Sequence, residues 1–222
     1  MAMPRGGAAD GEATRAALLD AAVRLFADEG IEAVSVRAVN RAAGQAPAAV
    51  HYHFGSKAAL LDAVVARYGE QVVADIGRRA HQLLDAPEPP APREVVEVLA
   101  EPYRLLLERD PAGGRAWLGV IAQLSLSGDP RVSQPQAEYN LALLAVARRA
   151  FPDVDPGEVE RALRLTVITL IQMLVQESDE PGQERGSLRP CMDVVVDFVS
   201  GGLMGAAEPG RLAPAASVQA QG

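Results

Sequence analysis

Few residues of this chain have side chains that could perform chemistry, and their spacing excludes most kinds of reactive site. The 222 residues include three histidines and one cysteine. His51 and His53 are two residues apart, so their rings would point in different directions on a helix, and no third metal ligand is evident near them. No glycine-rich phosphate loop, nucleophile elbow or acid-base constellation accompanies them. We therefore expect no catalysis, no metal and no cofactor.

The single cysteine, Cys191, excludes an intramolecular disulfide and a cysteine-based zinc cluster, so nothing in it indicates secretion. It lies on an apolar stretch, where a lone cysteine is usually a core residue; redox sensing is the less favoured alternative. The first residues lack the apolar stretch of a signal peptide, and no run of apolar residues is long enough to span a membrane. We expect a cytoplasmic protein without a membrane partner.

The charge of the chain is unevenly distributed. The formal net charge of -8 argues at first against a nucleic-acid partner. Residues 33–61, however, contain no Asp or Glu, whereas Arg37, Arg41 and Lys57 all lie within them. A local excess of cations is typical of a surface that meets phosphate groups. The sequence thus indicates a nucleic-acid interface in this one stretch.

The elements that must position these cations are two short helices. The periodicity of apolar residues predicts a helix over 14–28, and Ser35 can cap a second helix over 35–42. A glycine-containing break follows, and Pro47 suits the first turn of a third helix over 47–52. Two short helices joined by a tight turn are typical of a helix-turn-helix, whose second helix enters the major groove of DNA.

The remainder of the chain is also predicted to be helical, so the fold class is all-α. A long helix runs from Lys57 towards Leu84 and joins the helix-turn-helix to a second domain. Further helices are predicted over 94–109, 113–127, 130–151, 156–178 and 188–205. Segments 163–175 and 192–204 are apolar on nearly every side and must be buried, which indicates dimerisation. We expect a disordered arm over 1–12, a DNA-binding domain over 13–60, a ligand-binding and dimerisation domain over 61–206, and a disordered tail over 207–222.

Three sequence blocks resemble the tetracycline-repressor-like (TetR) family of bacterial regulators. They are LFADEGIEAVSV at the end of the first helix, the AG turn, and VHYHFGSKAALL. The resemblance covers about the first 65 residues, and the remainder is similar only in length and in being helical. It implies a ligand-responsive transcriptional regulator, a repressor, which binds a near-palindromic double-stranded DNA operator as a homodimer. A small hydrophobic effector would release the DNA.

The resemblance also implies which residues contact DNA. They are Ser35, Val36, Arg37, Gln45, Ala46, Pro47, Ala48, Ala49, His51, Tyr52 and Lys57. Because most of these side chains are short or apolar, we expect Arg37 to carry much of the base readout, followed by Gln45. His51 stands where family members commonly have a phosphate-binding tyrosine, and Val39 and Asn40 replace an isoleucine-alanine pair. A histidine titrates near neutrality, so a phosphate contact by His51 would depend on pH.

For the effector, the resemblance implies a pocket between the linking helix and a dimer bundle made by the last two long helices. Polar residues and one methionine that interrupt apolar stripes are the candidates: Tyr103, Arg104, Trp117, Gln123, Tyr139, Asn140, Thr169, Gln172 and Met173. For any single one of them, packing in the core or a solvated helix face is the commoner role. Arg78, Arg79, Arg148 and Arg149 are expected on solvated faces.

Two other classes of function stay open at this point. One is a helical protein-interaction adaptor whose helix-turn-helix has lost operator affinity, which the acidic total charge and the weak base-reading helix favour. The other is a small helical enzyme, for which the sequence offers no catalytic residues. A steep salt dependence of DNA binding would separate the regulator from the adaptor.

Overall fold

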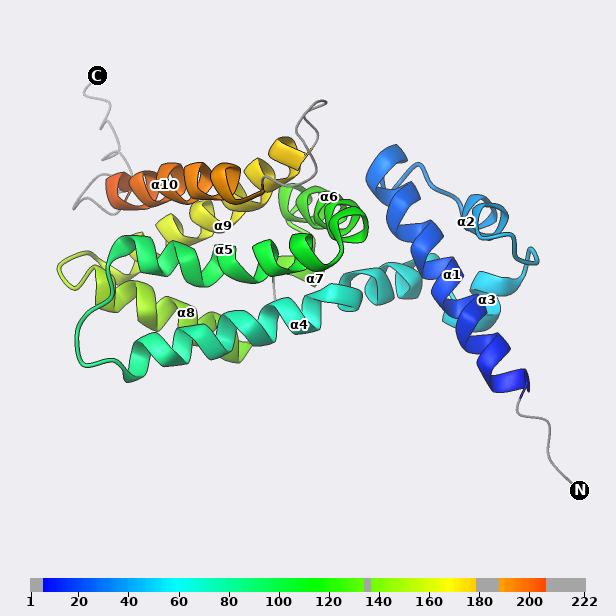
Figure 1. Cartoon of the computed structure of the whole chain (residues 1–222), viewed down its shortest axis with the longest axis horizontal. Coiled ribbons are helices and arrows are strands. Elements are labelled where there is room, and N and C mark those ends of the chain that lie inside the picture. Colours follow the sequence, from blue (N-terminus) through cyan, green and yellow to red (C-terminus); the bar gives the residue numbers. More distant parts are fainter. Residues whose placement is uncertain (1–5, 134–136, 179–187, 207–222) are drawn as a thin grey trace, which may run out of the picture. The chain divides into compact units, whose positions relative to one another are not determined.

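The structure, a computed structural model, describes residues 6–133, 137–178 and 188–206. These residues form ten α-helices and no other regular element (Figure 1). The predicted all-α fold class is therefore confirmed. Within the same ranges, no helix has both the length and the apolarity needed to cross a bilayer.

The chain divides into two compact units, each built from segments that are not contiguous in the sequence. The N-terminal unit comprises Met1–Val73 with Leu105–Pro135, and the C-terminal unit comprises Ala74–Arg104 with Gln136–Gly222. The predicted boundary near residue 60 does not coincide with this division, because helices from the middle of the chain pack with the helix-turn-helix. The N-terminal unit holds α1 (Gly6–Glu29), α2 (Val36–Ala42), α3 (Ala49–Phe54), the first part of α4 (Lys57–Asp85), the end of α5 (Pro92–Arg109), α6 (Pro111–Ser127) and α7 (Pro130–Ser133).

Helix α1 is the longest element of the N-terminal unit that lies entirely within it. Leu18, Ala22 and Phe26 are four residues apart and fully buried, so they form one continuous inward stripe. The helix begins at Gly6, so the expectation that residues 6–12 belong to a disordered arm is wrong. Extending an existing helix costs little, and the alanines of this segment favour the extension. Residues 1–5 of that arm and the predicted tail over 207–222 lie outside the described residues.

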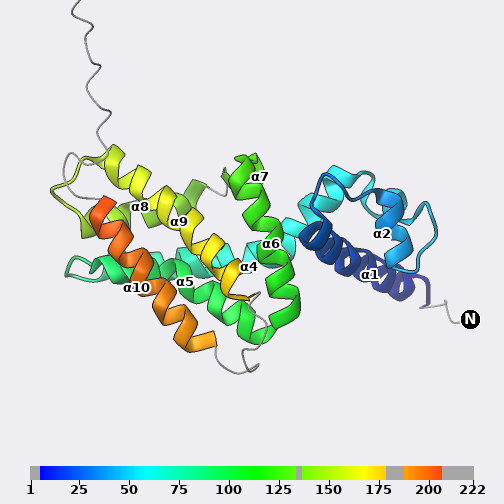
Figure 2. The same ribbon diagram turned by 90° about the horizontal axis from the view of Figure 1, so that it is seen from above.

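The C-terminal unit adds α8 (Ala137–Ala150), α9 (Pro156–Ser178) and α10 (Leu188–Ala206) to the rest of α4 and α5. Helices α9 and α10 lie side by side in both views (Figures 1 and 2). The helix predicted over 130–151 corresponds to α7 and α8, with residues 134–136 outside the described ranges. The other predicted helices agree with α5, α6, α9 and α10 to within two residues at each end.

Arg149 caps the end of α4. The sequence analysis expected it on a solvated face, and that prediction is wrong. Its guanidinium donates hydrogen bonds to the carbonyl oxygens of Leu83, Leu84, Ala86 and Glu88 at 2.7–3.1 Å. The last carbonyls of a helix have no partner within the helix, and a cation there also interacts favourably with the helix dipole. Arg149 therefore joins α8 to the loop that follows α4.

Candidate nucleic-acid interface

The geometry of the two short helices depends on one buried side chain, that of Asn40. Its amide nitrogen donates to the carbonyl oxygen of Pro47 at 2.6 Å, and its amide oxygen accepts from the Val50 N–H at 3.0 Å. Asn40 is only 2 % exposed. One side chain on α2 thus fixes the start of α3. The sequence showed Asn40 only as a departure from the family pattern, because its partners are backbone groups that no residue type reveals.

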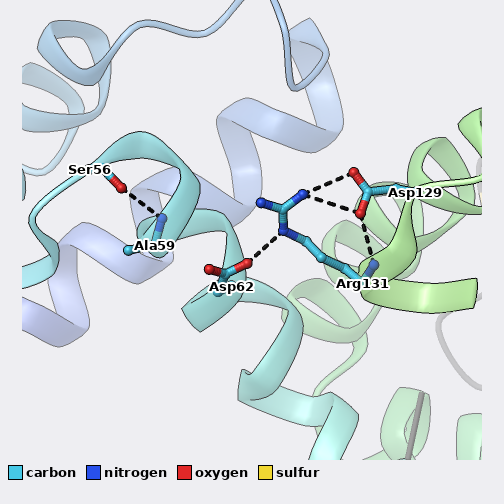
Figure 3. Close-up of polar contacts among 5 residues, drawn as sticks. All are labelled: Ser56, Ala59, Asp62, Asp129 and Arg131. Atoms are coloured by element: carbon cyan, nitrogen blue, oxygen red, sulfur yellow. Dashed lines mark hydrogen bonds and ion pairs between the residues drawn. The ribbon is translucent and has the colours of Figure 1, made fainter. Parts of the chain in front are cut away.

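Serine caps define where α2 and α4 begin. The Ser35 hydroxyl accepts from the Ala38 N–H at 3.2 Å, and the Ser56 hydroxyl accepts from the Ala59 N–H at 3.0 Å (Figure 3). Such caps satisfy N–H groups that the first turn of a helix leaves unpaired. Gly44 and Gly55, which end α2 and α3, both have positive φ, at 64° and 80°, which favours glycine. Residues adjacent in the sequence, two serine caps and two glycines, therefore determine where these helices begin and end.

Most of the predicted DNA contacts have exposed side chains. Tyr52, at 85 % exposure, is the most open large apolar side chain of the described chain. Ser35, Arg37, Ala46, Pro47, Ala48 and His51 are exposed too, whereas Val36, Gln45 and Lys57 are partly buried. Ala49 is the exception, because its methyl group is buried. We therefore no longer expect the Ala49 side chain to contact bases.

Two of these side chains have intramolecular partners that orient them. The Nδ1 atom of His51 lies 3.0 Å from the carbonyl oxygen of Gly55, which holds the ring at the end of α3. The Lys57 ammonium donates to the carbonyl oxygen of Glu32 at 3.2 Å, which ties the start of α4 to the loop between α1 and α2. Both side chains therefore have one contact within the fold.

Arg15 is a cation of this region that sequence reasoning missed. Its guanidinium carbon lies 4.9 Å from the centre of the Phe54 ring, which places it beside the end of α3. A cation over an aromatic face is a favourable contact. Arg15 lies on α1, outside the acid-free stretch of residues 33–61, so a count of charge along the sequence does not group it with Arg37.

Trp117 and Gln123, both predicted to contact an effector, instead fasten α6 within the N-terminal unit. The Trp117 indole donates to the carbonyl oxygen of Val65 on α4 at 3.2 Å. The Gln123 amide donates to the carbonyl oxygen of Phe26 at 2.8 Å and accepts from the Ile31 N–H at 3.1 Å. Their polar groups are thus already used by the backbone of α1 and α4. Both residues are therefore withdrawn as effector contacts.

Arg131 makes a further connection between α7 and α4 (Figure 3). Its Nε donates to a carboxylate oxygen of Asp62 at 2.6 Å, and its Nη1 contacts the Asp129 carboxylate at 2.9 Å. The hydrogen bond to Asp62 is the main reason why the pKa of Arg131 is raised. The guanidinium fork thus joins the beginning of the short helix α7 to the first turns of α4.

The start of α6 is joined to α4 by a hydrogen bond between a tyrosine and an aspartate. The Tyr68 hydroxyl donates to Asp110 at 2.5 Å, and Asp110 also accepts from the Gly113 N–H at 3.0 Å as the cap of α6. These two hydrogen bonds, with that from Tyr68 the larger, lower the pKa of the Asp110 carboxyl. Burial, followed by the same hydrogen bond, raises the pKa of Tyr68. The ionised carboxylate is therefore the form that the fold stabilises.

The remaining effector candidates lie in the C-terminal unit. Tyr103 is buried in α5, while Asn140, Thr169, Gln172 and Met173 are partly buried in α8 and α9; the Tyr139 side chain lies outside the described residues. A cavity of about 460 Å³ in this unit is lined by residues of α4, α5 and α10. Arg104 is the one predicted candidate that lines it. Among the described residues, no group of three or more His, Cys, Asp or Glu side chains could hold a metal ion.

Comparison with known proteins agrees with the geometry. Residues 18–64 match the model of the family described as bacterial regulatory proteins, tetR family. The HTH-type transcriptional regulator BetI of Rhizobium meliloti is 32% identical over 118 residues, which are 53% of this chain and 55% of BetI, so the match spans about half of that relative. An uncharacterised HTH-type transcriptional regulator of Mycobacterium tuberculosis is 25% identical over 193 residues, 87% of this chain and 90% of the relative.

A solved structure shows the same fold over nearly the whole chain. A TetR family transcription regulator from Marinobacter aquaeolei superposes with a TM-score of 0.58 at 19% identity, covering 88% of this chain and 97% of that one. The family consists of regulators, as the lack of catalytic residues in the sequence had suggested.

Proposed function

Because the chain belongs to the tetR family of bacterial regulatory proteins, we propose that it is a transcriptional repressor that binds operator DNA through α2 and α3. One observation carries the proposal: the exposed surface of these helices presents Arg37, His51 and Tyr52 within a stretch of the chain that has no acidic residue. The short side chains of Ala46, Pro47 and Ala48 allow the backbone to approach the floor of a groove closely. We place this activity in the cytoplasm, where a bacterial operator lies.

Contacts to DNA divide into those that position the protein and those that read the sequence. Arg37 is exposed and has the bidentate geometry that guanine recognises, so we assign base readout to it, with Gln45 as a second reader. Arg15, His51 and Lys57 are assigned to phosphates.

The proposed homodimer rests on a stripe of exposed apolar side chains on α9 and α10. Val194 and Phe198 are one helical turn apart on α10 and are 62% and 65% exposed, and Leu165 of α9 and Met204 of α10 are also exposed. A soluble protein rarely leaves such a patch uncovered. A second copy of the chain would cover it through the same surface on both protomers, and the resulting two-fold symmetry implies a near-palindromic operator.

The experiment that tests the proposal starts from the operator, which is unknown. Duplexes enriched by the protein from a random-sequence library would be labelled and titrated by fluorescence anisotropy at low and moderate salt. With about six phosphate contacts per dimer, log K is expected to fall with log salt at a slope of roughly -5. Arg37→Ala should weaken binding by about 10- to 100-fold, since a bidentate base contact contributes about 1–3 kcal/mol.

Arg148→Ala is the matched control, because Arg148 is exposed on α8 in the other unit and should leave DNA affinity unchanged. No enrichment from the library, or binding that is insensitive to salt, would instead favour the protein-interaction adaptor. Release of the enriched duplex by small molecules would then be tested on the same preparation.

A further inference from the structure

The hydrogen bonds of Asn40 join α2 to the following turn and to the start of α3. Its backbone carbonyl accepts from the Gln45 N–H at 2.9 Å. Its side-chain amide donates to the Pro47 carbonyl oxygen at 2.6 Å and accepts from the Val50 N–H at 3.0 Å. We propose that Asn40 is a positioning residue for operator recognition, which sets how well the protein distinguishes its operator from other DNA without touching DNA itself. The proposal rests on the DNA binding proposed above.

Helix α3 needs support from outside because it is only six residues long. An isolated helix of this length is not stable in water, since its few hydrogen bonds do not offset the conformational freedom lost in the first turn. Ala48, which precedes its first residue, has no side-chain oxygen to cap the free N–H groups. The Asn40 oxygen caps the Val50 N–H instead, from a neighbouring helix. The start of α3 is therefore held by α2.

The side-chain amide of Asn40 restricts both the position and the direction of this segment. One hydrogen bond alone allows rotation about itself, whereas the planar amide holds a carbonyl oxygen at Pro47 and an N–H group at Val50 together. Asn40 is only 2 % exposed, so water does not compete for these hydrogen bonds. The same burial keeps the Asn40 side chain away from a bound duplex. Any effect of Asn40 on DNA binding therefore acts through the residues that it positions.

Base readout depends more strongly on position than phosphate contact does. A binding group must lie within about 0.5 Å of its productive position to form its hydrogen bonds, whereas attraction between a cation and a phosphate carries no sequence information. Asn40 lies one helical turn after Arg37, and its carbonyl holds the turn that carries Gln45. A shift of α3 relative to α2 would disturb the match to a base sequence, while Arg15 and Lys57, on α1 and α4, keep their phosphates.

A purely structural role for Asn40 predicts a different outcome. If Asn40 only stabilised the fold, its loss would lower the fraction of folded protein, and the apparent affinities for operator and for other DNA would fall by the same factor. If Asn40 positions α3, the affinity for the operator falls further than the affinity for other DNA. The ratio of the two affinities therefore separates the two roles.

The test measures the binding of the full-length protein to two labelled duplexes by fluorescence anisotropy: the duplex enriched from the random-sequence library, and a scrambled duplex of the same length and composition. In Asn40→Ala, we expect the affinity for the enriched duplex to fall about 10- to 100-fold, the discrimination that a good base contact provides. The affinity for the scrambled duplex should change by less than about twofold, because phosphate contacts dominate it.

Asn40→Leu is the second variant. Its side chain fills a similar space without hydrogen bonds, so the same loss of discrimination would assign the effect to the amide and not to a void. It also provides the measurement if Asn40→Ala does not fold. Hydrogen exchange gives an independent readout, since the Val50 N–H should exchange faster in both variants after correction for global stability.

Gln123→Leu is the matched control. It removes the hydrogen bonds of Gln123 to the backbone of Phe26 and Ile31 in the same unit, so it lowers stability without touching α2 or α3. Its ratio of affinities should equal that of the unmodified protein.

Two results would overturn the positioning role and leave the repressor standing. In the first, the enriched duplex is bound and the ratio of affinities in both Asn40 variants equals that of the unmodified protein. In the second, the ratio falls as far in Gln123→Leu as in Asn40→Ala. A different failure, in which the unmodified protein enriches no duplex at all, would contradict the repressor and the positioning role together.

Discussion

The two units of this protein differ most in the surfaces that they leave exposed. On α2 and α3 of the N-terminal unit, most exposed side chains are small, polar or cationic, as at Arg37 and His51, and Tyr52 is the large apolar exception. On α10 of the C-terminal unit, several exposed side chains are large and apolar, as at Val194 and Phe198. The first surface is complementary to a polyanion and the second to another copy of the same apolar stripe. Similar helices thus present surfaces that suit the two different partners proposed for them.

The units also differ in how their helices are held. The short helices of the N-terminal unit bury little apolar area by themselves, and side chains such as Asn40 and Gln123 join them to the backbone of neighbouring segments. In the C-terminal unit, long helices interdigitate through residues such as Val195 and Val199, which are buried on α10. Substitutions should therefore act through polar contacts in one unit and through apolar surface in the other.

The largest effect is expected at the apolar surface. Phe198→Asp places a charge in the middle of the proposed dimer stripe, and the cost of desolvating that charge should dissociate the dimer. Because two linked reading heads bind far more tightly than one, operator affinity should fall about 100-fold or more. Sedimentation equilibrium and fluorescence anisotropy measure the two effects.

Leu126→Asp is the control for this substitution, since Leu126 is a similarly exposed apolar residue, at 69%, on α6 in the N-terminal unit. It should leave the oligomeric state unchanged. A Phe198→Asp protein that stays dimeric would show that α10 does not form the interface.

The next largest effect is expected at Asn40. Asn40→Ala leaves the Val50 N–H and the Pro47 carbonyl without partners, and an unsatisfied buried group costs about 1–3 kcal/mol. We expect the free energy of unfolding to fall by about 2–3 kcal/mol in urea denaturation. Arg41→Ala, an exposed neighbour on α2, should change it by less than about 0.5 kcal/mol. Equal effects of the two substitutions would argue against a fastening role for Asn40.

A smaller effect on stability is expected for two contacts of the N-terminal unit, the amide hydrogen bonds of Gln123 on α6 and the salt bridge of Arg131 on α7. Gln123→Leu keeps the size of the side chain and removes its hydrogen bonds to Phe26 and Ile31, so it should cost about 1–2 kcal/mol. Arg131→Met removes a contact to the exposed Asp62, and such a pair contributes about 0–1 kcal/mol. Hydrogen exchange at Ile31 should rise in Gln123→Leu and not in Arg131→Met. The reverse order of stability would mean that the salt bridge between α7 and α4 contributes more to the stability of this unit than the amide that binds the end of α1.

The smallest effect concerns pH and Asp110. Its pKa is lowered in the folded protein, so its contribution to stability is present above the unfolded-state value of about 3.9 and is lost as the pH falls through the lower folded value. The difference in unfolding free energy between the unmodified protein and Asp110→Asn should therefore be constant from pH 7 to about 5 and shrink below pH 4. Asp153→Asn, at an exposed position, is the control. A difference that is the same at all these pH values would contradict the hydrogen bond from Tyr68.

The sequence by itself determined the elements whose causes are local. Helix periodicity, the cap at Ser35, the turn at Gly44 and the proline-rich loop before α5 depend on residues within a few positions of each other. Most of the predicted helices agree with the observed ones, but α1 begins eight residues before the predicted start at Thr14, and the helix predicted over 130–151 corresponds to two helices. The family resemblance of the first 65 residues was confirmed for the same reason, since its motif is contiguous. The DNA contacts themselves stay predictions, although all but Ala49 have side chains that are exposed or partly exposed on the described surface.

Only the tertiary structure decided what the isolated polar residues do. From their type and position on a helix, Trp117 and Gln123 were predicted to contact a ligand, and Arg149 was predicted to lie on a solvated face. Each instead donates hydrogen bonds to backbone carbonyl groups more than 50 positions away in the chain. A polar side chain on a helix needs a partner, but its type does not say whether a carbonyl, a ligand or water supplies it. Which partner lies opposite depends on how distant segments pack, and that packing is set by the summed burial of many apolar residues rather than by any local signal.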